Sequence, residues 1–186
     1  SWGLCVQGVS RIRYAATAAA QGGASVRSVQ FRFAGQELTG TAGTTAVIGI
    51  SGTLRPTVTV TDSRGLTAYE DFSITLLAYA KPALNGVKLY RSDAEGKAAD
   101  SGTHIAGVAT AKYSSLGGKN RVTIKGYWKS VGGSYGSGVA MQAGTAKVIS
   151  GSTTLSTEKS YTAKVIATDS LGNTATYEAT IPTEKV

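Results

Sequence analysis

The sequence predicts an all-β chain made of two tandem immunoglobulin-like antiparallel β-sandwich domains, and three observations lead to this prediction. Apolar and polar residues alternate in many short runs, and Gly, Ser, Asn and Asp punctuate them, which is typical of strands joined by tight turns. A helical pattern does not extend far, because Gly22 and Gly23 end its nearest candidate at residues 15–21. The third observation is an internal repeat of domain size.

The repeat joins residues 58–74, VTVTDSRGLTAYEDFSI, to residues 165–181, VIATDSLGNTATYEATI. The two segments align without a gap at an offset of 107 residues (169 − 62), and the aligned pairs include Asp62 with Asp169 and Gly65 with Gly172. The period matches one immunoglobulin-like sandwich and exceeds the repeat length of solenoid proteins. Each copy is therefore expected to be the last hairpin of its own domain.

The Asp-Ser-x-Gly string predicts the turn of that hairpin. An Asp carboxylate at this place can accept backbone N–H bonds from residues further along the turn, and Gly65 can adopt positive φ without steric cost. Val58 and Val60 enter the turn with apolar side chains at period two, and Phe72, Ile74 and Leu76 continue that period on the return strand.

Other segments show the same alternation. Val29, Phe31 and Phe33 share one face of a predicted strand, and Val122, Ile124 and Trp128 share the inward face of another, which predicts a core position for Trp128. The glycine-dense residues 131–138 are expected to form a long hairpin loop. Further strands are expected at residues 10–14, 46–50, 87–91, 105–113 and 145–149.

The domain boundary is expected near Pro82, since proline cannot donate a hydrogen bond to a central ladder. This gives one immunoglobulin-like sandwich at residues 1–80 and another at residues 81–186. The first domain is short of residues for a full first strand, which suggests that the chain belongs to a longer array.

Charge and cysteine content narrow the classes of function. The chain has a net charge of +8, yet its Lys and Arg residues are scattered along the solvent sides of strands, with no basic arm or zinc-ligand spacing. We therefore expect no specific nucleic-acid binding, and the short apolar runs predict no membrane span. A basic surface could still meet an acidic polymer such as a cell-wall teichoic acid. The single cysteine, Cys5, has no partner for an internal disulfide and is expected to be a small buried apolar side chain.

Catalytic chemistry has little support in the sequence. His104 is the only histidine, which excludes His-based triads and multi-His metal sites within this chain. Asp62 and Asp169 are the carboxylates that a calcium site at a domain junction would use, but an Asp that stabilises its turn explains both. Tyr127 has outward parity on its predicted strand and Tyr135 lies in the glycine-rich loop, as a glycan contact would require. Isolated surface tyrosines are also ordinary in sandwiches, so no glycan-site residue is assigned. We predict a non-enzymatic protein with no catalytic, cofactor-binding or metal-binding residues and no cofactor.

The hairpin string TVTVTDSRG, followed by an apolar strand and AYAKP, resembles the repeated immunoglobulin-like units of a siphophage minor structural protein family. The run QGVSRI at residues 7–12 is similar to the start of such a unit. The pattern of Arg91, Asp93, Gly102, Thr103 and Lys119-Asn120 resembles its later part. Members of the family are tail-associated virion proteins or their prophage copies, and the resemblance implies that role without implying enzymatic residues.

Two functions follow as expectations. The first is a structural or interaction module of a phage or prophage virion protein, located in the tail or tail tip, with other tail proteins as partners and host cell-wall polysaccharide as a further one. The alternative is an adhesive, glycan-binding pair of immunoglobulin-like domains on a bacterial cell surface.

Overall fold

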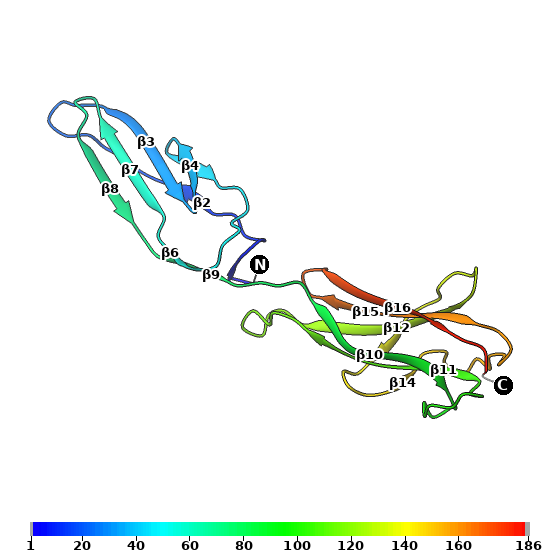
Figure 1. Cartoon of the computed structure of the whole chain (residues 1–186). Coiled ribbons are helices and arrows are strands. Elements are labelled where there is room, and N and C mark those ends of the chain that lie inside the picture. Colours follow the sequence, from blue (N-terminus) through cyan, green and yellow to red (C-terminus); the bar gives the residue numbers. More distant parts are fainter. Residues whose placement is uncertain (1, 185–186) are drawn as a thin grey trace. The chain divides into compact units, whose positions relative to one another are not determined.

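The computed structural model describes residues 2–184, and every regular element in that range is a β-strand. The chain divides into two compact units, Ser1–Tyr79 (unit 1) and Ala80–Val186 (unit 2). Each unit is a β-sandwich of the immunoglobulin-like class (Figure 1), as the sequence predicts.

Unit 1 is built on a four-stranded antiparallel sheet of order β4-β3-β7-β8. A two-stranded sheet, β2-β5, and a three-stranded sheet, β1-β9-β6, complete the unit. Strand β1 has only two residues and pairs in parallel with β9 through Cys5↔Leu76 and Val6↔Leu77. The bounds are β1 Cys5–Val6, β2 Arg13–Ala15, β3 Val26–Phe33, β4 Gln36–Thr39, β5 Ala42–Thr44, β6 Gly52–Leu54, β7 Thr57–Asp62, β8 Thr67–Asp71 and β9 Ile74–Leu77.

Unit 2 has a four-stranded sheet of order β13-β12-β15-β16 facing a three-stranded sheet of order β10-β11-β14. Its first strand is long and pairs with β11 from Ala83↔Lys112 to Ser92↔His104, with a register shift between Asn85 and Lys88. The bounds are β10 Ala83–Ser92, β11 His104–Lys112, β12 Val122–Ser130, β13 Val139–Met141, β14 Lys147–Val148, β15 Tyr161–Asp169 and β16 Thr174–Ile181.

The two cores follow the predicted parity of the strands. In unit 1, Phe31 is fully buried beside Phe33, and its ring stacks on that of Tyr14 at a centroid distance of 4.3 Å. In unit 2, Ile124 is buried and Trp128 shares its side of β12, as predicted. The indole is only half-buried, because it packs at the margin of the core, edge-on to the ring of Tyr161.

Residues 46–50 do not form the strand that the alternation predicts. Ile48 is buried, but its backbone N–H donates to the carbonyl of Ser10 and its own carbonyl accepts from Gly8. These bonds tie the segment to the irregular residues after β1 instead of to a sheet ladder. Alternation records which side chains are buried, and a buried loop can share that pattern with a strand.

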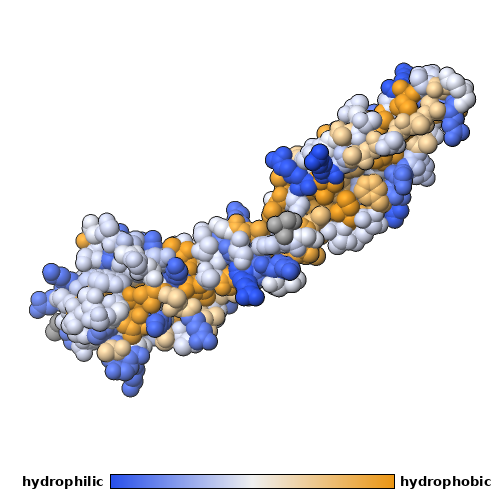
Figure 2. All heavy atoms as spheres, turned by 180° about the vertical axis from the view of Figure 1, so that it is seen from behind, coloured by the Kyte–Doolittle hydropathy of each residue, from blue (hydrophilic) through white to orange (hydrophobic). Residues whose placement is uncertain are grey.

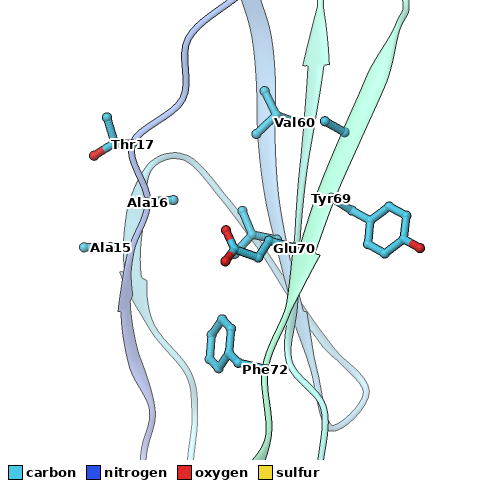
Figure 3. Close-up of a pocket in the computed structure, with 9 residues that line it drawn as sticks. Ala15, Ala16, Thr17, Val60, Tyr69, Glu70 and Phe72 are labelled. Atoms are coloured by element: carbon cyan, nitrogen blue, oxygen red, sulfur yellow. The ribbon is translucent and has the colours of Figure 1, made fainter.

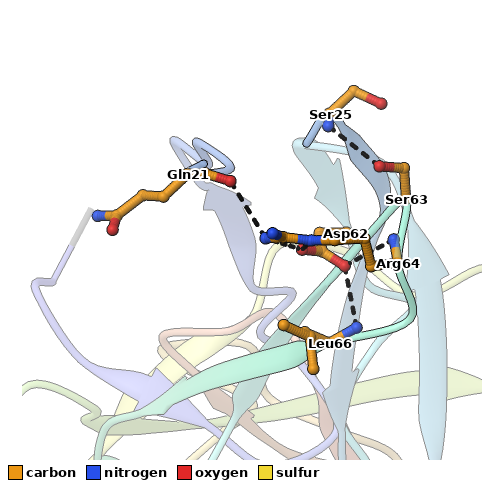
Figure 4. A network of polar contacts seen from close by, with 6 residues as sticks. All are labelled: Gln21, Ser25, Asp62, Ser63, Arg64 and Leu66. Carbon is orange, nitrogen blue, oxygen red and sulfur yellow. Dashed lines mark hydrogen bonds and ion pairs between the residues drawn. The ribbon is translucent and has the colours of Figure 1, made fainter. Parts of the chain in front are cut away.

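The two repeated hairpins adopt the same turn. In unit 1 the carboxylate oxygen Oδ1 of Asp62 accepts the N–H groups of Arg64 and Leu66, each at 2.9 Å (Figure 4). In unit 2 Oδ1 of Asp169 accepts the N–H groups of Leu171 and Asn173 at 3.0 and 2.9 Å. The glycines that close the two turns, Gly65 and Gly172, have positive φ values of 85° and 82°. The repeated letters therefore encode a turn held by its own aspartate.

The serine of each turn ties the hairpin to the neighbouring strand. Ser63 donates its backbone N–H to the carbonyl of Ser25, and its hydroxyl accepts the N–H of Ser25. Ser170 forms the same pair of bonds with Arg121. The aspartate thus fixes the shape of each turn, and the serine fixes its position beside the start of the neighbouring strand, β3 in unit 1 and β12 in unit 2.

A third turn of this kind lies in unit 2 at Asp93-Ala-Glu-Gly-Lys97. Oδ1 of Asp93 accepts the N–H groups of Glu95 and Lys97, and Gly96 has a φ of 87°. This carboxylate is satisfied by its own turn, as in the two repeated hairpins.

Candidate functional site

The candidates raised by the sequence lie apart from one another. Among residues 2–184, no group of three or more His, Cys, Asp or Glu side chains is arranged to hold a metal ion. His104 is half-buried in β11, with its Nδ1 3.3 Å from the hydroxyl of Thr103. Cys5 is a free thiol in β1 and is partly exposed instead of buried as predicted, because it lies in a two-residue strand at the margin of the core of unit 1. The carboxylates of Asp62 and Asp169 accept hydrogen bonds from their own turns.

Hydrophobic side chains reach the surface of both units (Figure 2), and Leu66, Tyr69 and Val131 are the most exposed of them. No helix able to cross a membrane occurs in the described part of the chain. Residues 131–138 lie between β12 and β13, which confirms the predicted hairpin loop.

The residues that do gather on one surface lie on the outer face of the β12-β15-β16 sheet. Tyr127, Lys164 and Glu178 stand side by side in neighbouring strands, because the register pairs Tyr127 with Lys164 and Lys164 with Glu178. Their inward neighbours Ala163 and Val165 are fully buried, so strand alternation turns this row to the outside. Lys129 lies two residues after Tyr127 on the same face.

The glycine-rich loop adds Tyr135 to this row. Its hydroxyl donates a hydrogen bond of 2.7 Å to Oε2 of Glu178. The Nζ of Lys164 lies 3.8 Å from the centroid of the Tyr135 ring, and that of Lys129 lies 4.8 Å from it. The ring also meets Tyr127 edge-on, at a centroid distance of 6.4 Å. We call Tyr127, Lys129, Tyr135, Lys164 and Glu178 the lysine–tyrosine face.

A close approach between loop and sheet makes this arrangement possible. Gly138 lies against the ring of Tyr127, and a Cβ atom at that position would overlap the ring. Glycine therefore lets the loop pass directly over the strand and deliver Tyr135 to the face. Partial burial is the first cause that raises the pKa of the Tyr135 phenol, followed by its hydrogen bond to Glu178 and the charge of that carboxylate.

Three lysines set the charge of the surface. Lys125 lies two residues before Tyr127 on the outward side of β12, as Lys129 lies two residues after it. Glu178 is the acidic member among the outward residues of these paired rows. The Nζ atoms of Lys129 and Lys164 lie against the Tyr135 ring, whose π face attracts cations. The face thus combines cationic groups with aromatic rings on neighbouring strands, an arrangement suited to binding anionic or sugar-bearing polymers.

The alternation of residues along the strand correctly predicts that Tyr127 faces outward. It does not show which other residues of the lysine–tyrosine face lie beside it. Lys164 and Glu178 belong to strands more than thirty residues away, and only the sheet register brings them beside Tyr127. Tyr135 depends on the path of the loop. A usable signal was present in the glycines around Tyr135, since a loop that lies flat on a sheet needs small residues.

No protein-family model matches the chain, and no curated protein matches it. Among solved structures, the chain is similar to the fibronectin(III)-like modules of Clostridium thermocellum CbhA. That match has 14% sequence identity and a TM-score of 0.38, and it covers 98% of this chain and 91% of the other. The FN1–FN3 domains of chicken CNTN1 match with 11% identity and a TM-score of 0.32, over 83% of this chain and 55% of the other.

Proposed function

We propose that this chain is a non-catalytic structural and interaction module of a phage or prophage virion protein of the tail, and that unit 2 contacts an acidic polymer of the host surface. The lysine–tyrosine face is the observation that carries the interaction role, because it places several cations and two aromatic rings on one rigid, accessible surface. The resemblance of the Asp-Ser-Arg-Gly hairpin to siphophage units supports the virion assignment.

The placement of the carboxylates supports a role without catalysis. Asp62, Asp93 and Asp169 each accept two backbone N–H groups of their own turn. Asp71 accepts two hydrogen bonds from Arg55 at an exposed position. General acid–base catalysis needs a carboxyl group aimed at a substrate in a cleft, and these groups are engaged in holding the backbone or an ion pair instead.

The chemistry of the face favours an anionic, repeating ligand. Lys129 and Lys164 lie on adjacent strands, so successive phosphates or carboxylates of a polymer could meet successive ammonium groups. The ring of Tyr127 lies beside them, with the Nζ of Lys164 5.3 Å from its centroid. A cell-wall teichoic acid, or an acidic polysaccharide with the same charge spacing, has this chemistry.

Binding to purified Gram-positive cell walls tests the proposal. We expect the chain to bind walls that retain teichoic acid, with an affinity that falls as salt rises and with no release of wall fragments. The variant Lys129→Gln/Lys164→Gln should bind about tenfold more weakly, corresponding to two surface charges. The matched control Lys97→Gln/Lys112→Gln removes two exposed lysines elsewhere in unit 2 and should bind like the parent.

Equal binding by both double variants, or binding that is unchanged on walls stripped of teichoic acid, would refute the interaction role. Turnover of a wall polymer that one carboxylate substitution abolishes would overturn the non-catalytic assignment. The alternative, an adhesive domain pair of a bacterial surface protein, is separated by the gene neighbourhood. Tape-measure, holin and lysin genes nearby support the virion role, whereas a sortase signal on the parent protein supports the alternative.

A further inference from the structure

A second feature lies in unit 1 and is independent of the lysine–tyrosine face. Strand β11 of unit 2 has a neighbour on both sides, in the order β10-β11-β14. The corresponding strand of unit 1, β2, pairs with β5 and, among residues 2–79, with no other strand. Within that described range, no strand takes the place that β10 has in unit 2, because the first strand, β1, pairs with β9 instead.

The unpaired edge of β2 presents main-chain hydrogen-bonding groups. Ile12 accepts from the N–H of Thr45, and Ala16 donates its N–H to Thr41, so both turn their backbone groups towards β5. Alternate residues of a strand turn their groups to opposite sides, and Arg13, Ala15 and Thr17 consequently turn theirs to the open edge. Such an edge is a template for pairing with another strand.

A groove of about 380 Å³ lies beside this edge, between residues 15–17 and strand β8. Its walls include Val58, Val60, Ala68 and Phe72, which face the same side of the β7-β8 hairpin. Figure 3 shows Phe72 and Glu70 pointing into the gap, whereas Tyr69 points away from it. Phe72 remains 43% exposed, so the groove holds apolar surface that a further strand would cover.

The repeat shows what occupies the same place in unit 2. At the offset of 107 residues, Ala68 and Glu70 correspond to Ala175 and Tyr177. In unit 2 these two residues line a hollow together with residues 82–87, which open strand β10. An extended segment is therefore the element that the fold itself places against this side of the hairpin.

Charge complementarity specifies the occupant further. Where unit 2 has Tyr177 facing its own first strand, unit 1 has the carboxylate of Glu70 aimed into the groove. A lysine or arginine on the inward side of an incoming strand would meet that carboxylate. Small apolar residues two positions away on either side would cover Val60 and Phe72.

We propose that unit 1 binds an extended segment of another polypeptide by strand addition to the open edge of β2. The segment carries alternating small apolar residues and one basic residue opposite Glu70. Main-chain bonds to Arg13, Ala15 and Thr17 supply much of the affinity, and the groove supplies the selectivity.

Two synthetic peptides test this on the full chain: VTATKTATV, with lysine at the central inward position, and VTATETATV, with glutamate there. We expect the lysine peptide to bind about tenfold more tightly, because one partner attracts Glu70 and the other repels it. Amide signals of Ala15 and Thr17 should shift in nuclear magnetic resonance spectra, and their hydrogen exchange should slow.

Two variants locate the binding. Glu70→Lys should reverse the preference to the glutamate peptide, whereas the control Glu95→Lys, at an exposed turn of unit 2, should leave it unchanged. Ala15→Pro removes an outward N–H without touching a bond to β5 and should abolish binding of both peptides.

Absence of binding at millimolar peptide, or binding that ignores both Glu70→Lys and Ala15→Pro, overturns the proposal. Analytical ultracentrifugation of the chain without peptide measures whether it forms a dimer. A dimer that Ala15→Pro dissociates would show that a second copy fills the groove, and it would overturn the assignment to a different polypeptide.

Discussion

Arg91 offers the sharpest test of how unit 2 is held together. It lies near the end of β10 with 6% of its surface exposed, and its guanidinium donates to four main-chain carbonyls. Nε donates to Pro182 at 2.7 Å and Nη1 to Gly102 at 3.1 Å, while Nη2 donates to Ser156 and Lys159 at 3.2 and 2.6 Å. One side chain therefore links β10 to three other parts of unit 2: the loop between β10 and β11, the loop between β14 and β15, and the segment that follows β16.

The variant Arg91→Met keeps an unbranched apolar stem and removes every donor. A hydrogen bond from a charged group contributes about 1.5–3 kcal/mol, but the four bonds act as one unit and their losses do not add. Several of the carbonyls lie at the end of the sandwich, where water can replace part of the lost bonding. We expect the free energy of unfolding of unit 2 to fall by about 3 kcal/mol, which lowers its melting temperature by roughly 15 °C.

Differential scanning calorimetry of the full chain measures this, since each unit should give its own transition. Arg121→Met, a change at an exposed arginine of the same unit, is the control and should alter the free energy of unfolding by less than about 0.5 kcal/mol. Arg91→Lys should lose about 2 kcal/mol, because one ammonium group cannot reach acceptors spread around a planar fork. A loss under about 1 kcal/mol for Arg91→Met, or a lysine variant as stable as the parent, would refute this account.

Three further predictions concern the other features. Hydrogen bonding to Arg64 lowers the pKa of Asp62, and Arg55 does the same for Asp71, so unit 1 should lose stability as the pH falls below about 4, and Asp62→Asn should flatten that dependence in urea titrations. The neutral phenol of Tyr135 stabilises its loop below about pH 10 and this contribution is lost above it, so absorbance at alkaline pH should show one late-titrating tyrosine that Tyr135→Phe removes. Trp128→Ala should cost about 2–3 kcal/mol in chemical denaturation, less than for a fully buried indole, because the ring is half-exposed beside Tyr161.

The turns were the most predictable part of the fold, because their determinants are local. Asp62 and Gly65 lie within four residues of each other, and the bonds that shape the turn run between them and their neighbours. All determinants of the turn therefore lie within one short sequence string, which occurs twice in the chain. Alternation likewise predicted the core positions of Phe31 and Ile124, since a strand must bury one face.

Sheet edges were not predictable in the same way. Whether β1 pairs with β9 or beside β2 depends on contacts between residues about seventy positions apart, and its two residues carry no pattern of their own. The open edge at Ala15 follows from that choice. The lysine–tyrosine face was hidden for a similar reason, because the register of β12 with β15 and the path of the loop bring its members together.

Four of the positions that carry the resemblance to phage proteins, Arg91, Asp93, Gly102 and Asn120, have structural roles. Arg91 and Gly102 share a hydrogen bond, and a methyl group at Gly102 would overlap the carbonyl of Ser92. Asp93 holds its turn. Asn120 is buried, donates to Asp169 and accepts the N–H of Ser170, which anchors the last hairpin.

What keeps unit 2 folded and what the chain binds are therefore two separate questions. Arg91 and Asn120 bond to main-chain groups that hold the sandwich of unit 2 together, so their presence says little about the ligand. In the two proposals above, recognition falls to residues on an outer face and beside an open edge. These are Lys129 and Lys164 on the outer face of unit 2, and Glu70 in the groove of unit 1. Substitutions of Arg91 or Asn120 should destabilise unit 2. Substitutions of Lys129, Lys164 or Glu70 should change binding and leave folding intact.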